Sequence, residues 1–138
     1  MVSQWPHDAN GMVNTLLLVP HKRLLVGGDF TTINGSGAAR YYASLNAATG
    51  QNDGYLKLHL RGHYVYPGVH FNATEVYNQQ LSPDGRRVLA EGVFTSVQGQ
   101  QRQQIFMLDL NATQGNVSGW DSSEFNQQCN DGHPVSAT

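Results

Sequence analysis

Charged side chains are scarce in this sequence, and cysteine is almost absent. Lysine, arginine, aspartate and glutamate make up 13% of the 138 residues, and the net charge is −2. An average soluble protein contains about 25% of these residues. Because there is no basic excess, we expect no binding to nucleic acid. Cys129 is the single cysteine, so no internal disulfide is possible. It is either an ordinary thiol or, in a secreted fragment, a cysteine separated from its partner.

Long hydrophobic runs are missing as well. The longest contain four apolar residues, at 16–19 and 105–108, whereas about 20 are needed to span a bilayer. We therefore expect no membrane insertion. Residues 1–6 lack the basic start and apolar stretch of a signal peptide. The chain is therefore expected either to stay inside the cell or to derive from a longer secreted precursor.

Neutral amides and glycine are abundant instead, and they occur within an internal duplication. The chain has 11 asparagines, 12 glutamines and 15 glycines, a composition that favours a loop-rich β protein. Residues 13–50 and 76–115 align with small gaps, and eleven identities recur in order at separations of 62 to 64 residues. Such a period indicates a repeat architecture. The matched pairs are Val13/Val76, Leu18/Leu81, Pro20/Pro83, Arg23/Arg87, Leu25/Leu89, Gly28/Gly92, Phe30/Phe94, Thr31/Thr95, Gly35/Gly99, Arg40/Arg102 and Leu45/Leu108.

Each copy divides into short apolar segments separated by turn signals. The expected strands are 13–19, 23–28, 40–46 and 55–60 in the first copy, and 76–81, 86–92, 102–110 and 117–120 in the second. Ser82-Pro83-Asp84-Gly85 predicts a tight hairpin, because proline presets φ and glycine accepts a positive φ. No segment shows a sustained 3.6-residue period, so little helix is expected. The predicted fold class is all-β, with two four-stranded antiparallel units.

Two runs carry a resemblance to a known repeat. GGDFTTINGSGAARYYASLNAATG and EGVFTSVQGQQRQQIFMLDLNATQG resemble the delta-60 type (kelch-like) β-propeller repeat, which occurs in secreted and cell-surface proteins. The first run matches the family pattern at eleven positions: Gly27, Gly28, Phe30, Thr31, Asn34, Gly35, Arg40, Leu45, Asn46, Thr49 and Gly50. The second departs from it at Glu91, Gln98 and Gln114, and Trp120 lies where such repeats often place a tryptophan. The resemblance implies propeller-type blades, and it is nearly silent on chemistry because a fold does not determine a function.

Two blades cannot close a ring, since propellers have about four to eight of them. We therefore expect part of an incomplete or oligomer-completed β-propeller, although two sheets folded onto each other as a sandwich are an alternative. The expected organisation is a lead-in segment at 1–12, a first repeat at 13–60, an aromatic and histidine-containing insertion at 61–75, a second repeat at 76–120, and a tail toward a further blade at 121–138.

The candidate metal-binding and recognition residues lie in or beside the insertion. His59, His63 and His70 are weak candidates for a metal site, because histidines four apart on a strand share a face. Hydrogen-bonded or solvated loop histidines are the alternative. Tyr64, Tyr66 and Phe71 are the best candidates for ligand recognition, since aromatic rings supply contact area at low entropic cost; the alternative is that they cap a blade. Asn-x-Ser/Thr sequons make four positions possible glycosylation sites in a secretory pathway: Asn34, Asn72, Asn111 and Asn116.

No catalytic motif accompanies these residues. The sequence contains no GxSxG, HExxH, Walker or GxGxxG pattern. Arg40 and Arg102 are expected to be buried donors to loop carbonyls. We therefore expect no enzyme and no cofactor, but an extracellular or cell-surface binding or scaffolding module. Its expected partners are a protein or carbohydrate ligand and further blades of the same chain or copies of itself. The alternatives are a fragment of a propeller enzyme with its active-site residues on absent blades, and a structural subunit of a repetitive assembly or filament.

Overall fold

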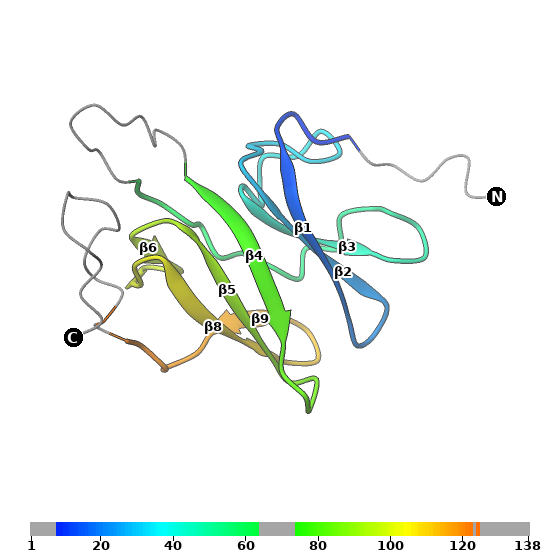
Figure 1. Cartoon of the computed structure of the whole chain (residues 1–138). Helices are drawn as coiled ribbons and strands as arrows, with labels where there is room; N and C mark the ends of the chain where they lie inside the picture. The colour runs from blue at the N-terminus through cyan, green and yellow to red at the C-terminus, as the bar shows by residue number, and fades with distance from the viewer. Residues whose placement is uncertain (1–7, 64–73, 123, 125–138) are drawn as a thin grey trace.

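The structure, a computed structural model, describes residues 8–63, 74–122 and 124 of the chain (Figure 1). These residues form nine β-strands and no α-helix. All strand pairs within the sheets are antiparallel. The all-β expectation is thus confirmed. In this part of the chain, no helix is long and apolar enough to cross a membrane.

The first sheet contains three strands in the order β1-β2-β3. They are β1 (Val13–Val19), β2 (Arg23–Gly28) and β3 (Tyr42–Asn46). The first two have the predicted bounds, and the third begins two residues later than expected. His21 and Lys22 have φ values of 67° and 56°. Positive φ at two adjacent turn residues matches the right-handed twist of the flanking strands, so β1 and β2 form a tight hairpin.

The second sheet contains four strands in the order β4-β5-β8-β9. They are β4 (Glu75–Leu81), β5 (Arg87–Val93), β8 (Ile105–Leu110) and β9 (Gly115–Val117). A small hairpin of β6 (Ser96–Val97) and β7 (Gln100–Gln101) leaves the sheet between β5 and β8. The predicted turn at 82–85 joins β4 to β5: Gly85 has φ 72° and its N–H donates to the Ser82 carbonyl at 2.9 Å.

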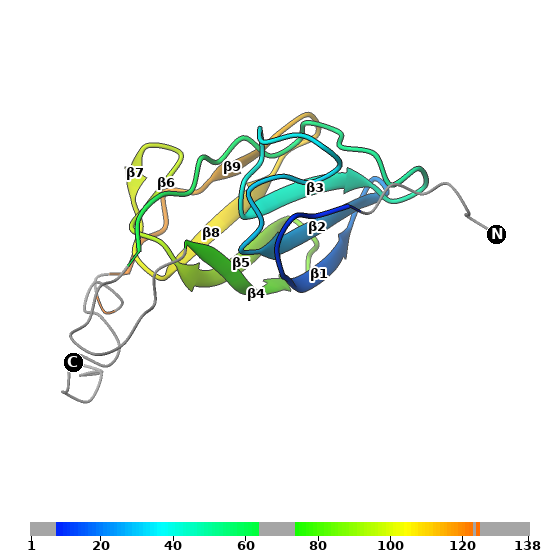
Figure 2. The same ribbon diagram turned by 90° about the horizontal axis from the view of Figure 1, so that it is seen from above.

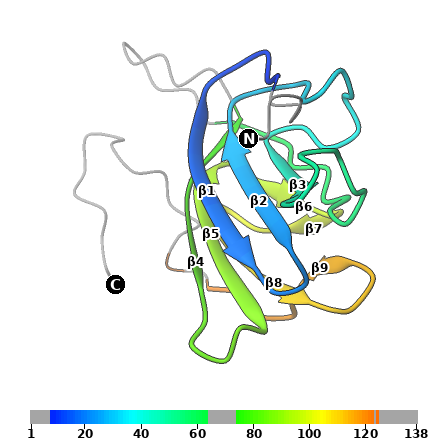
Figure 3. The ribbon, with the colours of Figure 1, turned by 90° about the vertical axis from the view of Figure 1, so that its right-hand side faces the viewer.

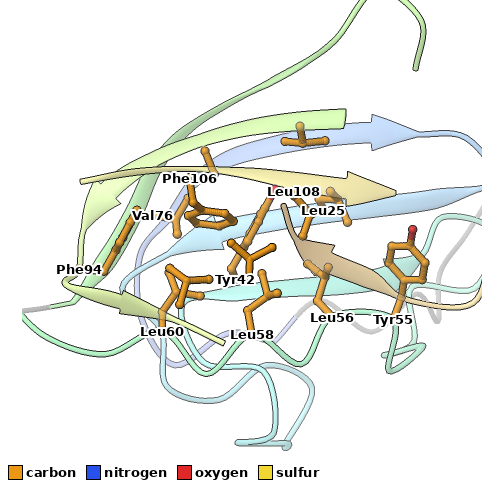
Figure 4. Packing of buried hydrophobic residues seen from close by; sticks show 14 of the residues in the cluster. Leu25, Tyr42, Tyr55, Leu56, Leu58, Leu60, Val76, Phe94, Phe106 and Leu108 are labelled. Atoms are coloured by element: carbon orange, nitrogen blue, oxygen red, sulfur yellow. The ribbon is translucent and has the colours of Figure 1, made fainter. Parts of the chain in front are cut away.

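The prediction of four strands in the first unit is wrong. Residues 55–60 form no strand of the first sheet but cross to the second one, as an extended segment that we call the strap. Leu56 forms an isolated parallel bridge to Gly115, and Arg61, just after the strap, an antiparallel bridge to Ser96. Leu56, Leu58 and Leu60 are buried, and they point into the core (Figure 4). The alternating pattern thus correctly indicated an extended segment, but its apolar side chains fill the space between the sheets.

The two sheets pack face to face, with β1 beside β4 (Figures 2 and 3). The main cluster of buried residues draws on both sheets and on the strap. At its centre Phe106 contacts Tyr42 and Phe94 edge to face, with ring centroids 6.1 and 5.4 Å apart. A buried glutamine also joins the sheets: the Tyr42 hydroxyl donates to Gln79 Oε1 at 2.6 Å, and Gln79 Nε2 donates to the Leu25 carbonyl at 2.9 Å.

The duplication recurs in the backbone of the two units. Three pairs of positions share unusual positive φ values: Asn34 and Gln98 (50° and 52°), Gly35 and Gly99 (78° and 75°), and Tyr41 and Gln104 (68° and 67°). The Gly28 N–H donates to the Tyr41 carbonyl, and the Gly92 N–H donates to the Gln104 carbonyl, each at 2.9 Å. In this correspondence Arg40 is equivalent to Gln103 and not to Arg102, so the sequence alignment was wrong by one residue at this position.

Candidate functional site

A cleft of about 480 Å³ opens near the start of β4. Its described walls are the loop residues Gly37, Ala38, Arg40 and Tyr41, residues 59–62 at and just after the end of the strap, and Thr74, which directly precedes β4. Two arginines and one histidine lie along these walls: Arg40, Arg61 and His59. The cleft therefore combines a loop of the first unit with the segment that crosses to the second.

Backbone hydrogen bonds fix one wall at the turn before β3. The Tyr41 N–H donates to the Phe30 carbonyl at 3.0 Å, and its carbonyl accepts from Gly28 at 2.9 Å. Tyr41 adopts φ 68°, and its half-buried ring packs against the main core. Arg40 precedes this turn and is exposed, while its carbonyl accepts from the Tyr42 N–H at 2.7 Å. The Arg40 side chain thus projects from an anchored backbone.

The opposite wall is anchored on the β6 segment. The Arg61 N–H donates to the Ser96 carbonyl at 3.0 Å, and the Arg61 carbonyl accepts from the N–H groups of Thr95 and Ser96 at 2.8 and 3.1 Å. Gly62 has φ 93°, and a Cβ at this position would clash with the Thr95 side chain. The backbone here needs glycine for both reasons. The exposed Arg61 side chain is consequently carried by a segment held at both its N–H and its carbonyl.

The guanidinium groups of the cleft have no acidic partner among the described residues. The ion pairs in that part of the chain join Arg23 to Asp53, Arg87 to Asp109 and Arg102 to Asp121. Within residues 8–63, 74–122 and 124, the Arg40 and Arg61 side chains also form no hydrogen bond. The cleft is thus positively charged in a protein whose net charge is −2, and it offers two free guanidinium groups to an anion.

Arg102 differs sharply from Arg40, although both were expected to be structural. Arg102 is 7% exposed and donates to the carbonyls of Gln101 and Ser118 at 2.8 and 3.1 Å. The expectation of a buried carbonyl donor is therefore confirmed for Arg102. It is wrong for Arg40, because Ala39 occupies the position equivalent to Arg102 and Arg40 lies one residue further along, at the surface.

The histidines proposed as metal ligands do not form a metal-binding group where they are described. His59 and His63 are exposed, and His70 lies outside the described residues. Within residues 8–63, 74–122 and 124, no three histidine, cysteine, aspartate or glutamate side chains gather closely enough to hold a metal. Of the candidate histidines, His59 is the one placed in the cleft.

The aromatic candidates Tyr64, Tyr66 and Phe71 lie outside the described residues, as do Asn72 and Cys129. The three remaining sequons differ in their surroundings. Asn34 Nδ2 donates to the Gly50 carbonyl at 2.8 Å, and Asn116 Oδ1 accepts from Gln98 at 2.9 Å. Asn111 is exposed, and no hydrogen bond of its side chain is recorded. Its amide is consequently the most accessible of the three.

Comparison of the chain with models of protein families, with curated proteins and with solved structures found no match.

Sequence reasoning missed Arg61 and Tyr41 as parts of a site. The local signal for Arg61 was its position before Gly62, where a positive φ bends the chain. Tyr41 carried no such signal, because its left-handed conformation comes from the loop that closes against Phe30 and Gly28.

Proposed function

We propose that this chain is a non-enzymatic binding module made of two kelch-like, propeller-type units, and that it acts outside the cell or at the cell surface. Its ligand is an acidic carbohydrate, one that bears carboxylate or sulfate groups, bound in the cleft between Arg40 and Arg61. The observation that carries the proposal is a pair of guanidinium groups on anchored backbone that line one cleft and have no acidic partner among the described residues.

The dimensions and chemistry of the cleft support a saccharide. Its volume of about 480 Å³ falls within the range of roughly 300–1,000 Å³ typical of small-ligand sites. A protein partner would instead need about 800 Å² of surface on each side. The planar fork of arginine pairs with two oxygens of a carboxylate or a sulfate at once. Tyr41 lies beside Arg40 and supplies an apolar surface for a sugar ring.

Binding is tested by calorimetric titration with oligogalacturonate, a sulfated heparin oligosaccharide, and a neutral oligosaccharide of the same length. Arg40→Gln and Arg61→Gln remove one charge each. A charge-assisted hydrogen bond contributes about 1.5 kcal/mol, so each change is expected to weaken binding of the acidic ligand about tenfold.

Arg86→Gln is the matched control, because Arg86 is exposed and lies outside the cleft. It removes the same charge and is expected to leave the affinity unchanged. Equal losses in all three variants would mean that the ligand senses only net charge. Equal binding of the neutral oligosaccharide, or no binding of either acidic ligand, would also contradict the proposal.

A further inference from the structure

The outer face of the first sheet exposes leucines that nothing in the described structure covers. Leu16 and Leu18 are 61% and 62% exposed, and they pair directly with Val26 and Leu24 across the hairpin. Paired residues share one face of a sheet. On the same face, the loop after β2 covers Val26, Ala43 and Leu45 with Phe30 and Ile33, so the exposed leucines continue a small apolar cluster. We call this surface the leucine face.

The equivalent face of the second unit is buried. The spacing of 63 residues places Gln79 and Leu81 where the first unit has Leu16 and Leu18. Gln79 is 8% exposed, and Leu81 packs against the main core. The partners of Gln79 and Leu81 on β5, Ala90 and Val88, are fully buried. The second sheet thus uses its counterpart of the leucine face to pack on the first sheet.

The complementary half of this contact is present on the other side of the molecule. Within the chain, Leu25, Tyr42 and Ser44 of the first sheet face the second sheet. Their equivalents are Leu89, Ile105 and Met107, and strand pairing places these on the side of the second sheet that points away from the first. Leu89 and Met107 are partly exposed, and Ile105 is buried. We call this surface the methionine face.

We propose that the methionine face of one molecule docks on the leucine face of a second copy, repeating between chains the packing of the two sheets within a chain. The occupant of the leucine face is therefore this protein itself. The contact joins two different surfaces, so it generates a ring or a filament rather than a closed two-fold dimer. This inference is independent of the cleft and of its ligand.

The residues that occupy the positions equivalent to Gln79 and Tyr42 on the two free faces are compatible with such a contact. Inside the chain, Gln79 meets the Tyr42 hydroxyl in a buried hydrogen bond. At the free faces, the two equivalent residues are Leu16 and Ile105, so both members of the pair are apolar. Because Ile105 is already buried, a contact between copies would bury mainly the exposed hydrocarbon of Leu16 and Leu18 and the exposed parts of Leu89 and Met107. This burial is favourable by roughly 25 cal/mol per Å² of apolar surface.

The test is mass measurement by light scattering and analytical ultracentrifugation, from micromolar to millimolar protein. The wild-type chain is expected to form species larger than a monomer. Leu16→Glu/Leu18→Glu, and separately Leu89→Lys/Met107→Lys, are each expected to remain monomeric. Lys57→Glu is the control for the first variant, because Lys57 is exposed on the strap and the change in charge is the same. It is expected to assemble as the wild type does.

Mixing the two monomeric variants is the decisive step. Each retains one intact face, so a head-to-tail contact predicts heterodimers and nothing larger. Pairing of two leucine faces would instead let the Leu89→Lys/Met107→Lys variant dimerise alone and would overturn the proposal. Circular dichroism verifies that the variants are folded, and Met107→Lys alone replaces the double variant if it is not. A wild-type chain that is monomeric throughout, or that assembles only after deletion of residues 1–7 or 125–138, would also overturn it.

Discussion

The hydrogen bond between Tyr42 and Gln79 gives the sharpest test of how the two sheets are joined. The two side chains are 1% and 8% exposed, and the hydroxyl lies 2.6 Å from Gln79 Oε1. Tyr42→Phe leaves that oxygen buried without its donor, which costs about 1–3 kcal/mol of unfolding free energy. Gln79→Met keeps the volume but leaves the Tyr42 hydroxyl without its acceptor and also removes the bond from Gln79 Nε2 to the Leu25 carbonyl. We therefore expect a loss about 1 kcal/mol larger than for Tyr42→Phe.

The double variant separates this bond from general packing. Phenylalanine and methionine are both apolar, and replacing both partners of a hydrogen bond by apolar groups of similar shape is nearly neutral. The double variant is therefore expected to lose about 1–2 kcal/mol less than the sum of the single losses. Urea unfolding followed by circular dichroism measures all three variants.

Asp84→Asn supplies the control for additivity, because Asp84 lies at the tip of the β4–β5 turn and its recorded bonds stay within that turn. Combined with Tyr42→Phe, it should give additive losses to within about 0.5 kcal/mol. If Tyr42→Phe and Gln79→Met were also additive with each other, the two side chains would not be bonded. The contact described between the sheets would then be incorrect.

Three further predictions concern the backbone, pH and modification. Gly92→Ala should cost about 2 kcal/mol or more by urea unfolding, because its Cβ would meet the Glu75 carbonyl, whereas Gly119→Ala, with open space around it, should be nearly neutral. Burial raises the pKa of Tyr42 above its ordinary value of 10.0, so the folded chain holds this proton after the unfolded chain has lost it. The stability that this proton contributes is therefore fully present below pH 10 and is lost as the pH rises further; the urea midpoint should fall between about pH 10 and pH 11, and less so in Tyr42→Phe. In a eukaryotic secretory host, mass spectrometry should find a glycan at Asn111, and Asn111→Gln should remove it; an unmodified Asn111 would contradict its assignment as the accessible sequon.

Local sequence signals predicted the strands well where residues close together in the sequence determine the structure. The hairpin of β1 and β2 and the turn at 82–85 follow from neighbouring residues: proline lies in both turns and presets φ, and Gly85 in the second accepts a positive φ. Residues 55–60 show the limit of such signals. Their alternating pattern predicts an extended segment with one apolar face, but whether that face completes the first sheet or fills the space beside the second depends on contacts far along the chain.

The cleft was less predictable than the fold for a related reason. Arg40 and Arg102 look equivalent in the sequence, yet one is exposed and the other buried. The difference is a shift of one residue in the loop before β3, which places Ala39 rather than Arg40 at the position equivalent to Arg102. Arg61 joins the site only because the strap crosses between the units. No sequence motif indicates the cleft, because its residues come from two segments, 37–41 and 59–62, that no common motif or spacing connects.

The strap also has a consequence for duplication of the repeat. Its three leucines belong to the first unit by sequence, but they are buried against the second sheet. A gene duplication that copied one sequence period would thus copy each sheet together with the leucines that pack against the following sheet. The repeat in the sequence is therefore offset from the packing unit of the fold. Because of this offset, the segment that ends one repeat packs against the sheet of the next repeat and connects the two.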